Sequence, residues 1–505
     1  MNENLFTTLE NSIKDQNRIF IQTPDGISYR YCDMLSLSGQ YANILDTLGV
    51  KKGDRVAVQV EKSPQVLFLY LACLRIGAIY LPLNTDYTSR EVHYFLNDAR
   101  PTIAICKPSS LEAFENIARE TGVKSVLTLN NDNTGSFIEL SDKEDSSFST
   151  VAVKNDDLAA ILYTSGTTGV SKGAMLSHEN LRSNALTLAQ YWHFSEDDIL
   201  LHPLPIFHTH GLFVATNTIL LSGASMILQP KFDIEQLIKL MPTATTMMGV
   251  PTHYLRLLAS KEFTKEATEN MRLFISGSAP LSPETHKDFY HLTGHKILER
   301  YGMTETNMNT SNPYDGERVP GTVGYALPNV DVRISDPKTG VPLDQGEVGV
   351  IEVRGPNVFQ GYWKMPEKTA AEFRDDGFFI TGDLGQIDEK GYISIVGREK
   401  DLIISGGLNI YPAEVEAILD AVTGVIESAV IGLPHPDFGE AVTAVVAGIE
   451  SEKLNESIIR EQLAKELAKF KVPKRVIFVD SLLRNTMGKI QKKVMREQYQ
   501  DLYKS

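Results

Sequence analysis

Short apolar runs alternate with helical patterns through the first part of the chain. Residues 55–60 and 78–83 read as buried strands, and the apolar segment 64–75 between them reads as a buried helix. Further short strands are predicted at 102–106 and 125–129. Such alternation is typical of parallel sheets covered by helices. We therefore predict an α/β fold with parallel layers here.

The pattern changes near residue 320. Between 321 and 397, short β-rich pieces are separated by Gly, Pro and Asp turns. This texture favours a small antiparallel or barrel-like subdomain. After residue 401 helical and strand patterns mix again, over a length sufficient for a separate α+β domain of about 100 residues.

Composition and charge narrow the class of protein. The chain has 505 residues, 42% of them hydrophobic, and a formal net charge of −15. That length exceeds the roughly 250–300 residues at which single cores stop growing, and an acidic chain is atypical of nucleic-acid binding. The N-terminus does not read as a secretory signal, and the apolar run 66–74 is too short to span a bilayer, which takes about 20 residues. We expect a cytoplasmic protein with several domains, no nucleic acid, no membrane and no obligate protein partner.

A segment rich in Gly, Thr and Ser follows the apolar strand predicted at 158–163. Residues 164–173 hold three glycines, several hydroxyls and Lys172. Glycines allow close approach of the backbone to a phosphate, while hydroxyls, N–H groups and a lysine bind it. The ordinary phosphate-loop pattern of NTPases does not match, because Lys172 precedes Gly173. The segment predicts a phosphate site of another kind, with a flexible turn as the alternative.

This segment resembles the signature of the AMP-forming adenylate ligases, the superfamily of acyl-CoA synthetases, peptide-synthetase adenylation domains and luciferases. Ser171 stands where that family often has Pro. Further segments resemble the family's other motifs in the family's order: 301–305, 379–383, 397–401 and 484–490. The resemblance implies a large N-terminal domain of parallel α/β layers with a small β-barrel-like subdomain, and a smaller mobile α+β C-terminal domain.

The resemblance also implies which residues bind ATP. Tyr301 would stack on adenine, Asp383 would accept hydrogen bonds from the ribose, and Arg398 would reach the ribose or a phosphate. Mg²⁺ would be held by Glu305 and Thr168, which offer hard oxygen ligands. The residues implied for ATP are Thr164, Ser165, Gly166, Thr167, Thr168, Gly169, Lys172, Ser278, Ala279, Pro280, Glu299, Tyr301, Thr304, Asp383, Arg398 and Lys489.

Catalysis and domain movement follow from the same resemblance. Lys489 would bridge the acid and the α-phosphate, so the implied catalytic residues are Lys489, Glu305 and Thr304. Lys400 would be the pivot that absorbs the backbone change. The implied domains are 1–397, a hinge at 398–401, and 402–505. The loop implied for coenzyme A comprises Ser405, Gly406 and Gly407.

Arg300 bears on the choice of acid. By the resemblance it lies close to the acyl pocket, where a fatty-acid ligase needs no charge, and an Arg can bind a second carboxylate bidentately. The alternative is a surface Arg paired with Glu299 or Glu284. His208 would line the same pocket; a core histidine or a metal ligand is the alternative, although a third ligand is missing from the sequence.

Segments 207–212, 274–281 and 299–316 resemble those of the family's malonate-activating ligases. The resemblance implies that Arg300 binds the spectator carboxylate, helped by His208 and Ser278. It also implies that two residues crowd the central carbon, Thr209 and Met308. We therefore predict ATP-dependent ligation of malonate, a small dicarboxylic acid, to coenzyme A through a malonyl-adenylate. Methylmalonate or another small acid, loading of a carrier protein, and nucleotide sensing without catalysis remain alternatives.

Overall fold

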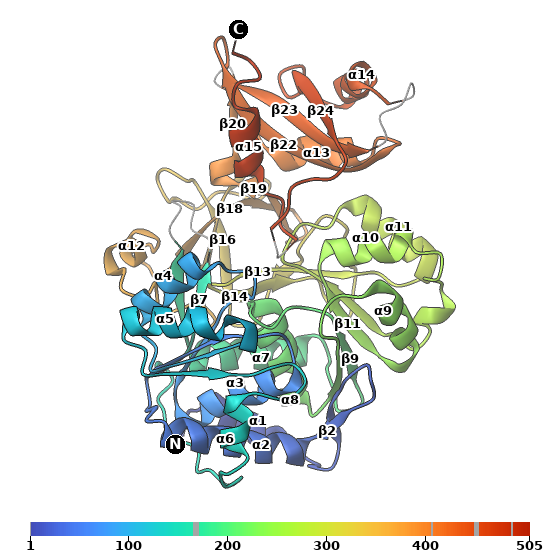
Figure 1. Ribbon diagram of the computed structural model, residues 1–505. Coiled ribbons are helices and arrows are strands. Elements are labelled where there is room, and N and C mark those ends of the chain that lie inside the picture. Colours follow the sequence, from blue (N-terminus) through green and yellow to red (C-terminus); the bar gives the residue numbers. More distant parts are fainter. Residues whose placement is uncertain (1, 165–170, 406–407, 449–453, 486–487, 505) are drawn as a thin grey trace.

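The computed structural model has a large lower part and a smaller unit that carries the C-terminus above it (Figure 1). It describes residues 2–164, 171–405, 408–448, 454–485 and 488–504. The predicted site residues outside these ranges are Ser165, Gly166, Thr167, Thr168, Gly169, Gly406 and Gly407. Within the described ranges, no helix is both long and apolar enough to cross a membrane.

A nine-stranded sheet runs through the lower part. In spatial order its strands are β15 (Tyr325–Ala326), β14 (Asn307–Ser311), β13 (Leu298–Met303), β12 (Leu273–Ser276), β11 (Thr246–Gly249), β9 (Ile199–His202), β10 (Ser225–Leu228), β1 (Ile19–Gln22) and β2 (Ser28–Arg30). The strands from β13 to β1 pair in parallel, as predicted. The edge strands β14, β15 and β2 are antiparallel. For β14 and β2 the short connections to β13 and β1 explain this, because parallel neighbours need a long crossover.

A six-stranded sheet lies beside it. Its order is β6 (Ser125–Thr128), β5 (Ile103–Cys106), β3 (Arg55–Gln59), β4 (Ile79–Pro82), β7 (Leu158–Thr164) and β8 (Lys172–Ser177), with only β8 antiparallel. Helix α3 (Pro64–Ile76) is buried over its whole length, as its apolar sequence predicted. It shares one apolar core with Val56 of this sheet and Phe20 of the nine-stranded sheet.

Helices cover both sheets and supply several site residues. They are α1 (Leu5–Ser12), α2 (Tyr31–Thr47), α4 (Ser89–Ala99), α5 (Leu111–Thr121), α6 (Ser136–Ser141), α7 (His178–Tyr191), α8 (Thr218–Ser222), α9 (Ile234–Leu240), α10 (Pro251–Ala259), α11 (Pro283–Thr293) and α12 (Pro366–Ala371). A π-helical segment, η2 (His210–Asn217), precedes α8. Such segments are frequent at functional sites.

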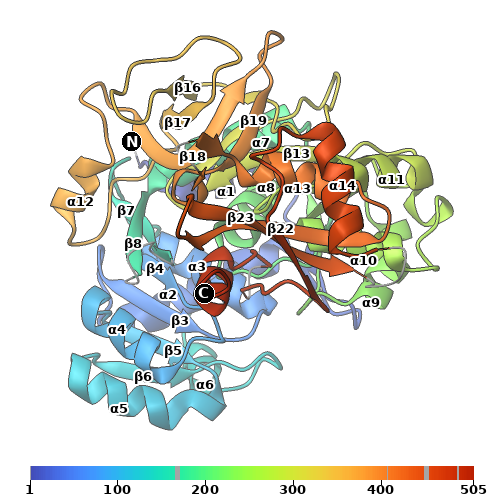
Figure 2. The same cartoon turned by 90° about the horizontal axis from the view of Figure 1, so that it is seen from above.

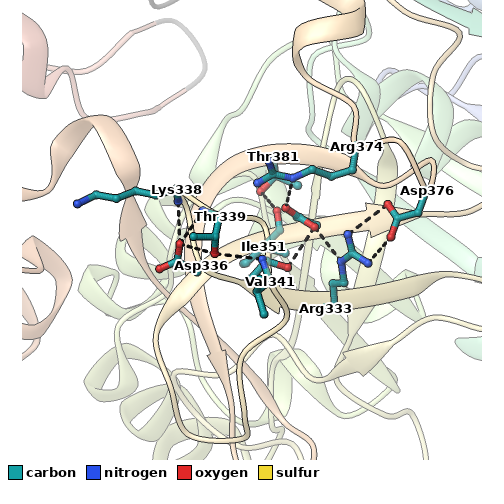
Figure 3. A network of polar contacts seen from close by, with 11 residues as sticks. Arg333, Asp336, Lys338, Thr339, Val341, Ile351, Arg374, Asp376 and Thr381 are labelled. Carbon is teal, nitrogen blue, oxygen red and sulfur yellow. Dashed lines mark hydrogen bonds and ion pairs between the residues drawn. The ribbon is translucent and has the colours of Figure 1, made fainter.

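The β-rich stretch predicted after residue 320 forms a four-stranded antiparallel sheet. Its order is β16 (Asp331–Ser335), β17 (Gly349–Arg354), β18 (Phe379–Ile387) and β19 (Ile393–Arg398). The ladder is open, without a β16–β19 pairing among the described residues, so the antiparallel form of the expectation holds rather than a closed barrel. Figure 3 shows polar contacts that brace it: Arg333 and Arg374 bind the buried Glu352, and the Thr381 hydroxyl donates to a carbonyl of β17.

The C-terminal unit is α+β, as predicted. Its sheet contains β20 (Ile403–Ser405), β21 (Leu408–Ile410), β22 (Val425–His435), β23 (Gly439–Gly448) and β24 (Arg475–Val479), and its helices are α13 (Pro412–Asp420), α14 (Glu456–Glu466) and α15 (Lys492–Tyr499). It has apolar clusters of its own, between residues 403 and 503. Seen from above, it covers the middle of the molecule (Figure 2). The short 3₁₀ turn η5 (Glu399–Asp401) joins it to β19.

Candidate active site

The C-terminal unit closes a cavity on the nine-stranded sheet. The connection between β24 and α15 descends from that unit toward β13 (Figure 1). The cavity measures about 300 Å³. Its lining comes from both parts of the chain: Leu204, Pro205, His208, His210, Gly211, Val250, Thr252, His253, Arg256, Ser278, Arg484, Asn485 and Gly488. A larger hollow of about 660 Å³, beside α7, is lined by none of the predicted site residues.

Arg300, on β13, is a buried cation. The residue is 3% exposed, and its Nε and Nη2 make no hydrogen bond within the described residues. Gly277 leaves room for it, because a Cβ there would lie 2.3 Å from the guanidinium carbon. Burial lowers the pKa of Arg300 to about 9, so it stays charged at pH 7. The surface ion pair considered as an alternative is therefore wrong.

Two of the three cavity histidines, His208 and His210, are neutral at pH 7. Burial, with the charges of Lys489 and Arg300, lowers the pKa of His208 to about 3. Burial and Arg300 also hold the pKa of His210 well below its usual value. Nδ1 of His210 lies 3.2 Å from the Ser278 hydroxyl, and Ser278 has a φ of 71°. A non-glycine residue in this region is strained, and such strain is common at functional sites.

Lys489 is held by a tight turn of the chain. The backbone N–H of Asn485 donates to the Lys489 carbonyl, and the Asn485 side chain accepts from the Lys489 N–H, both at 2.9 Å. Arg484 donates to the Gly488 carbonyl and pairs with Glu427 on β22. Burial lowers the pKa of Lys489; Arg398 and Arg300 lower it further, while Asp383 and Glu305 oppose them. The ammonium is therefore within electrostatic reach of residues predicted for the nucleotide and of Arg300, predicted for the acid.

The residues predicted for the nucleoside come together on β13, β18 and β19. The Tyr301 hydroxyl donates to Oδ2 of Asp383 at 2.5 Å, and Oδ1 of Asp383 lies 2.6 Å from Nε of Arg398. Thr381 accepts the Asp383 N–H at 3.1 Å, which joins this group to the braced sheet of Figure 3. The charge of the Asp383 carboxylate raises the pKa of Arg398 above its usual value.

The phosphate side contains two residues that sequence reasoning missed, Tyr362 and Glu372. Nζ of Lys172 lies 3.2 Å from Oε1 of Glu372 and 3.9 Å from the Tyr362 ring centre. The Tyr362 hydroxyl lies 3.0 Å from Oε1 of Glu305 and 2.7 Å from Oε2 of Glu372. Burial raises the pKa of Glu305. The Lys172–Glu372 contact spans 200 residues, so local sequence carries no signal for it.

The other predicted residues are more scattered. Thr304 lies in the turn between β13 and β14, and Met308 is buried on β14. Thr209 is buried just before η2, with its hydroxyl unpartnered among the described residues. The Glu299 carboxylate lies 3.6 Å from Nδ1 of His286 on α11, so its partner is a helix side chain. The remaining predicted residues are not cavity residues: Thr164, Ala279, Pro280, Lys400 and Ser405.

Of the cavity lining, only His208 and Ser278 were predicted as site residues. His210 belongs to the His-x-His pair, which was a usable signal; Thr252, His253 and Arg256 stand on α10, which the sequence gave no reason to place here. Among the described residues, no cluster of His, Cys, Asp or Glu could hold a metal, so the His-x-His pair has no third ligand there.

A sequence-family comparison identifies the class. The model described as AMP-binding enzyme matches residues 10–363, and that described as AMP-binding enzyme C-terminal domain matches 414–489. The chain therefore belongs to the AMP-binding enzyme family.

Particular relatives refine this. The crystal structure of ATP-bound MatB from Rhodopseudomonas palustris is 57% identical, with all of both chains covered and a TM-score of 0.98. Apo MatB has the same identity and coverage but a TM-score of 0.87. The arrangement of this chain thus resembles the ATP-bound form more than the apo form. A malonate–CoA ligase of Arabidopsis thaliana is 33% identical over 95% of this chain and 86% of its own length.

Proposed function

We propose that this chain is a malonate–CoA ligase. It uses ATP to form malonyl-adenylate with release of pyrophosphate, and then transfers the malonyl group to coenzyme A with release of AMP. The observation that carries the proposal is the buried guanidinium of Arg300, whose Nε and Nη2 have no hydrogen-bond partner among the described residues, beside a cavity of about 300 Å³. The malonate–CoA ligase of Arabidopsis thaliana among the relatives supports it. A cytoplasmic location, where ATP and coenzyme A are supplied, belongs to the same proposal.

Malonate has two carboxylates, and the site treats them differently. Arg300 would bind the spectator carboxylate bidentately through Nε and Nη2, two nitrogens of one guanidinium edge, the geometry in which an Arg binds a carboxylate most strongly. The neutral His208 and the Ser278 hydroxyl add donors at the cavity. A fatty acid would leave the buried Arg300 charge without a partner, at a large desolvation cost.

The reacting carboxylate then meets the α-phosphorus of ATP. The charges of Arg300, Glu305 and Asp383 all act on Lys489, so its ammonium would bridge the attacking oxygen and the α-phosphate. Positioning and charge neutralisation are the main contributions a protein makes to phosphoryl chemistry of this kind. Asp383 would exchange its Tyr301 bond for the ribose hydroxyls, and the freed Tyr301 ring would face the adenine.

The phosphate side fits a magnesium ion brought in with ATP. Mg²⁺ is usually bound through one or two carboxylates together with substrate phosphates. Glu305, 6% exposed, offers one such carboxylate, and Thr168 is the other ligand in this proposal, although it lies outside the described residues. When bound, the ion would neutralise phosphate charge. Lys172 would leave Glu372 for the same phosphates.

The second half-reaction needs Lys489 to withdraw. We infer that the C-terminal domain, 402–505, rotates about Lys400 and presents the loop after Ser405 to the pantetheine of coenzyme A. Arg496 on α15 lies 2.8 Å from Asp401, which ties the helix after Lys489 to the hinge. A rotation at Lys400 would therefore carry α15 and the turn bearing Lys489 with it.

A panel assay tests the proposal. AMP release is measured with ATP, coenzyme A and one acid at a time: malonate, methylmalonate, acetate, succinate and octanoate. Malonate should give the highest kcat/KM, and malonyl-CoA should accumulate in step with AMP. Pyrophosphate release with malonate but no thioester from free coenzyme A would instead indicate loading of a carrier protein. A failure of malonate to stimulate pyrophosphate release would exclude the proposal.

A further inference from the structure

Lys62, which precedes α3, is a buried cation that the reaction above does not use. The residue is only 8% exposed. The ammonium donates to the His202 carbonyl at 2.7 Å and to the Leu204 carbonyl at 2.8 Å, and it lies 3.1 Å from Nδ1 of the His202 ring. An ammonium has three hydrogens, so these acceptors use all of them. All three acceptors belong to one short stretch of chain.

That stretch is the cavity wall. Leu204, Pro205 and Gly211 all line the cavity and lie between β9 and the start of η2. Because Nδ1 of His202 accepts from Lys62, the ring carries its proton on Nε2, which lies 2.9 Å from the Gly211 carbonyl. Lys62 thus holds the first end of the wall directly and the far end through the His202 ring.

The wall is tightly folded between these two ends. A Cβ on Gly211 would lie 2.1 Å from the Pro205 carbonyl oxygen, so the backbones at these positions are almost in contact. A small change in the His202–Gly211 contact would therefore move atoms that face the acid. His208 lies inside the same turn and would move with them.

Packing alone does not account for a lysine here. A buried ion can often be replaced by an apolar side chain of similar volume without loss of stability. Burial holds the pKa of Lys62 well below its usual value, and its three contacts to His202 and Leu204 offset that cost. Lys62 donates to the cavity wall directly, and through the His202 ring it also acts on Gly211. These contacts indicate that Lys62 shapes the acyl cavity.

We propose that Lys62 is a positioning residue that fixes the cavity wall from His202 to Gly211 and thereby limits the length of the acid. It acts through His202 and the wall rather than by touching the substrate. The inference rests on the proposed function, because a length limit has meaning only for an enzyme that activates an acid.

The test is the variant Lys62→Met, which keeps an unbranched side chain and removes every donor. The measured quantity is the ratio of kcat/KM for malonate to kcat/KM for succinate, one methylene longer. This ratio is independent of the fraction of enzyme that is folded. Since one methylene is worth about 10–200-fold in a shaped pocket, we expect the ratio to fall about tenfold. KM for ATP should stay within about twofold of wild type, because the wall lies away from the nucleotide residues.

Arg75 provides the matched control. It is a second buried cation, 6% exposed, that donates to backbone carbonyls, those of Leu35 and Phe148, each at 2.7 Å. It does not line the cavity. Arg75→Met removes a buried, backbone-bonded cation as Lys62→Met does, but should leave the malonate-to-succinate ratio unchanged.

The outcomes separate the two proposals. A Lys62→Met enzyme with the wild-type ratio overturns the role of Lys62 and leaves the proposed function standing. A wild-type enzyme without malonate-dependent AMP release overturns the proposed function. Should Lys62→Met not yield folded protein, His202→Asn removes the Nε2 contact to Gly211 and keeps an oxygen near Lys62. The same fall in the ratio is expected for it, and an unchanged ratio counts against the inference.

Discussion

The nucleotide side and the acyl side of this site are built with opposite electrostatics. On the nucleotide side each charge already has a partner: Asp383 pairs with Arg398, and Lys172 with Glu372. On the acyl side the cations Arg300 and Lys62 are buried without a carboxylate in contact among the described residues.

The difference follows from what each side receives. ATP arrives with its own phosphate charge and a metal, so the nucleotide side exchanges one set of partners for another. The acyl side instead has an excess of buried positive charge, which the second carboxylate of a dicarboxylate would neutralise. The desolvation cost of this charge in the free enzyme is a source of selectivity, since an acid with one carboxylate does not offset it.

The largest effect should come from Lys489, on which charges of both sides act. Lys489→Ala removes the group proposed to bridge the reacting carboxylate and the α-phosphate. Loss of one preorganised donor costs about 10²–10³ in rate, so malonate-dependent pyrophosphate release should fall by that factor. Thioester formation from added malonyl-adenylate should fall far less. Lys493→Ala, on the exposed face of α15, is the control and should behave as wild type; equal loss in both half-reactions would contradict the assignment.

Arg300→Ala should break the acyl side alone. It removes two charged hydrogen bonds, each worth about 1.5–3 kcal/mol, so kcat/KM for malonate should fall at least a hundredfold. Activity with acetate should be unchanged or higher. Arg300→Lys keeps a charge without the planar fork and should recover only part of the loss. An equal decline with malonate and acetate would show that Arg300 does not bind the spectator carboxylate.

Asp383→Asn should affect the nucleotide side alone. The neutral amide weakens the contact with Arg398 and the charge-assisted bonds expected from the ribose, so KM for ATP should rise about tenfold. KM for malonate should stay near the wild-type value. Asp376→Asn, which loses a contact to Arg333 in the same sheet, is the control. Similar increases in both KM values would mean that the two sides are not separable.

The smallest effect concerns stability below neutral pH. Burial, with the charges of Arg256 and Lys62, lowers the pKa of His253 to about 3. The unfolded chain binds a proton at this residue near pH 6.5 and the folded chain does not, so stability is lost as pH falls below 6.5. From pH 7 to 5.5 the loss from one such histidine is about 1 kcal/mol. Thermal unfolding of His253→Phe should depend less on pH than wild type over this range; an identical dependence would contradict the assignment.

Local sequence determined much of the fold and the motifs. The largely apolar segment 64–75 forms the buried helix α3, because a helix that is apolar on all sides must lie between layers. The short β-rich pieces and turn residues after residue 320 predicted the antiparallel sheet. Tyr301, Asp383 and Arg398 were found from short motifs, and the structure brings them into contact.

Tertiary structure alone decided how the charges are partnered. Nothing local distinguishes Lys62 or Arg300 from a solvated cation, since burial depends on which segments pack around them. Glu372 reaches Lys172 across 200 residues of sequence, and Arg256 reaches the cavity only because α10 packs there. Sequence therefore determined which chemical groups this protein carries, while packing determined which of them lose water. A positive side chain that has lost its water favours a ligand with a compensating negative charge, and in this way burial makes it selective for an acid.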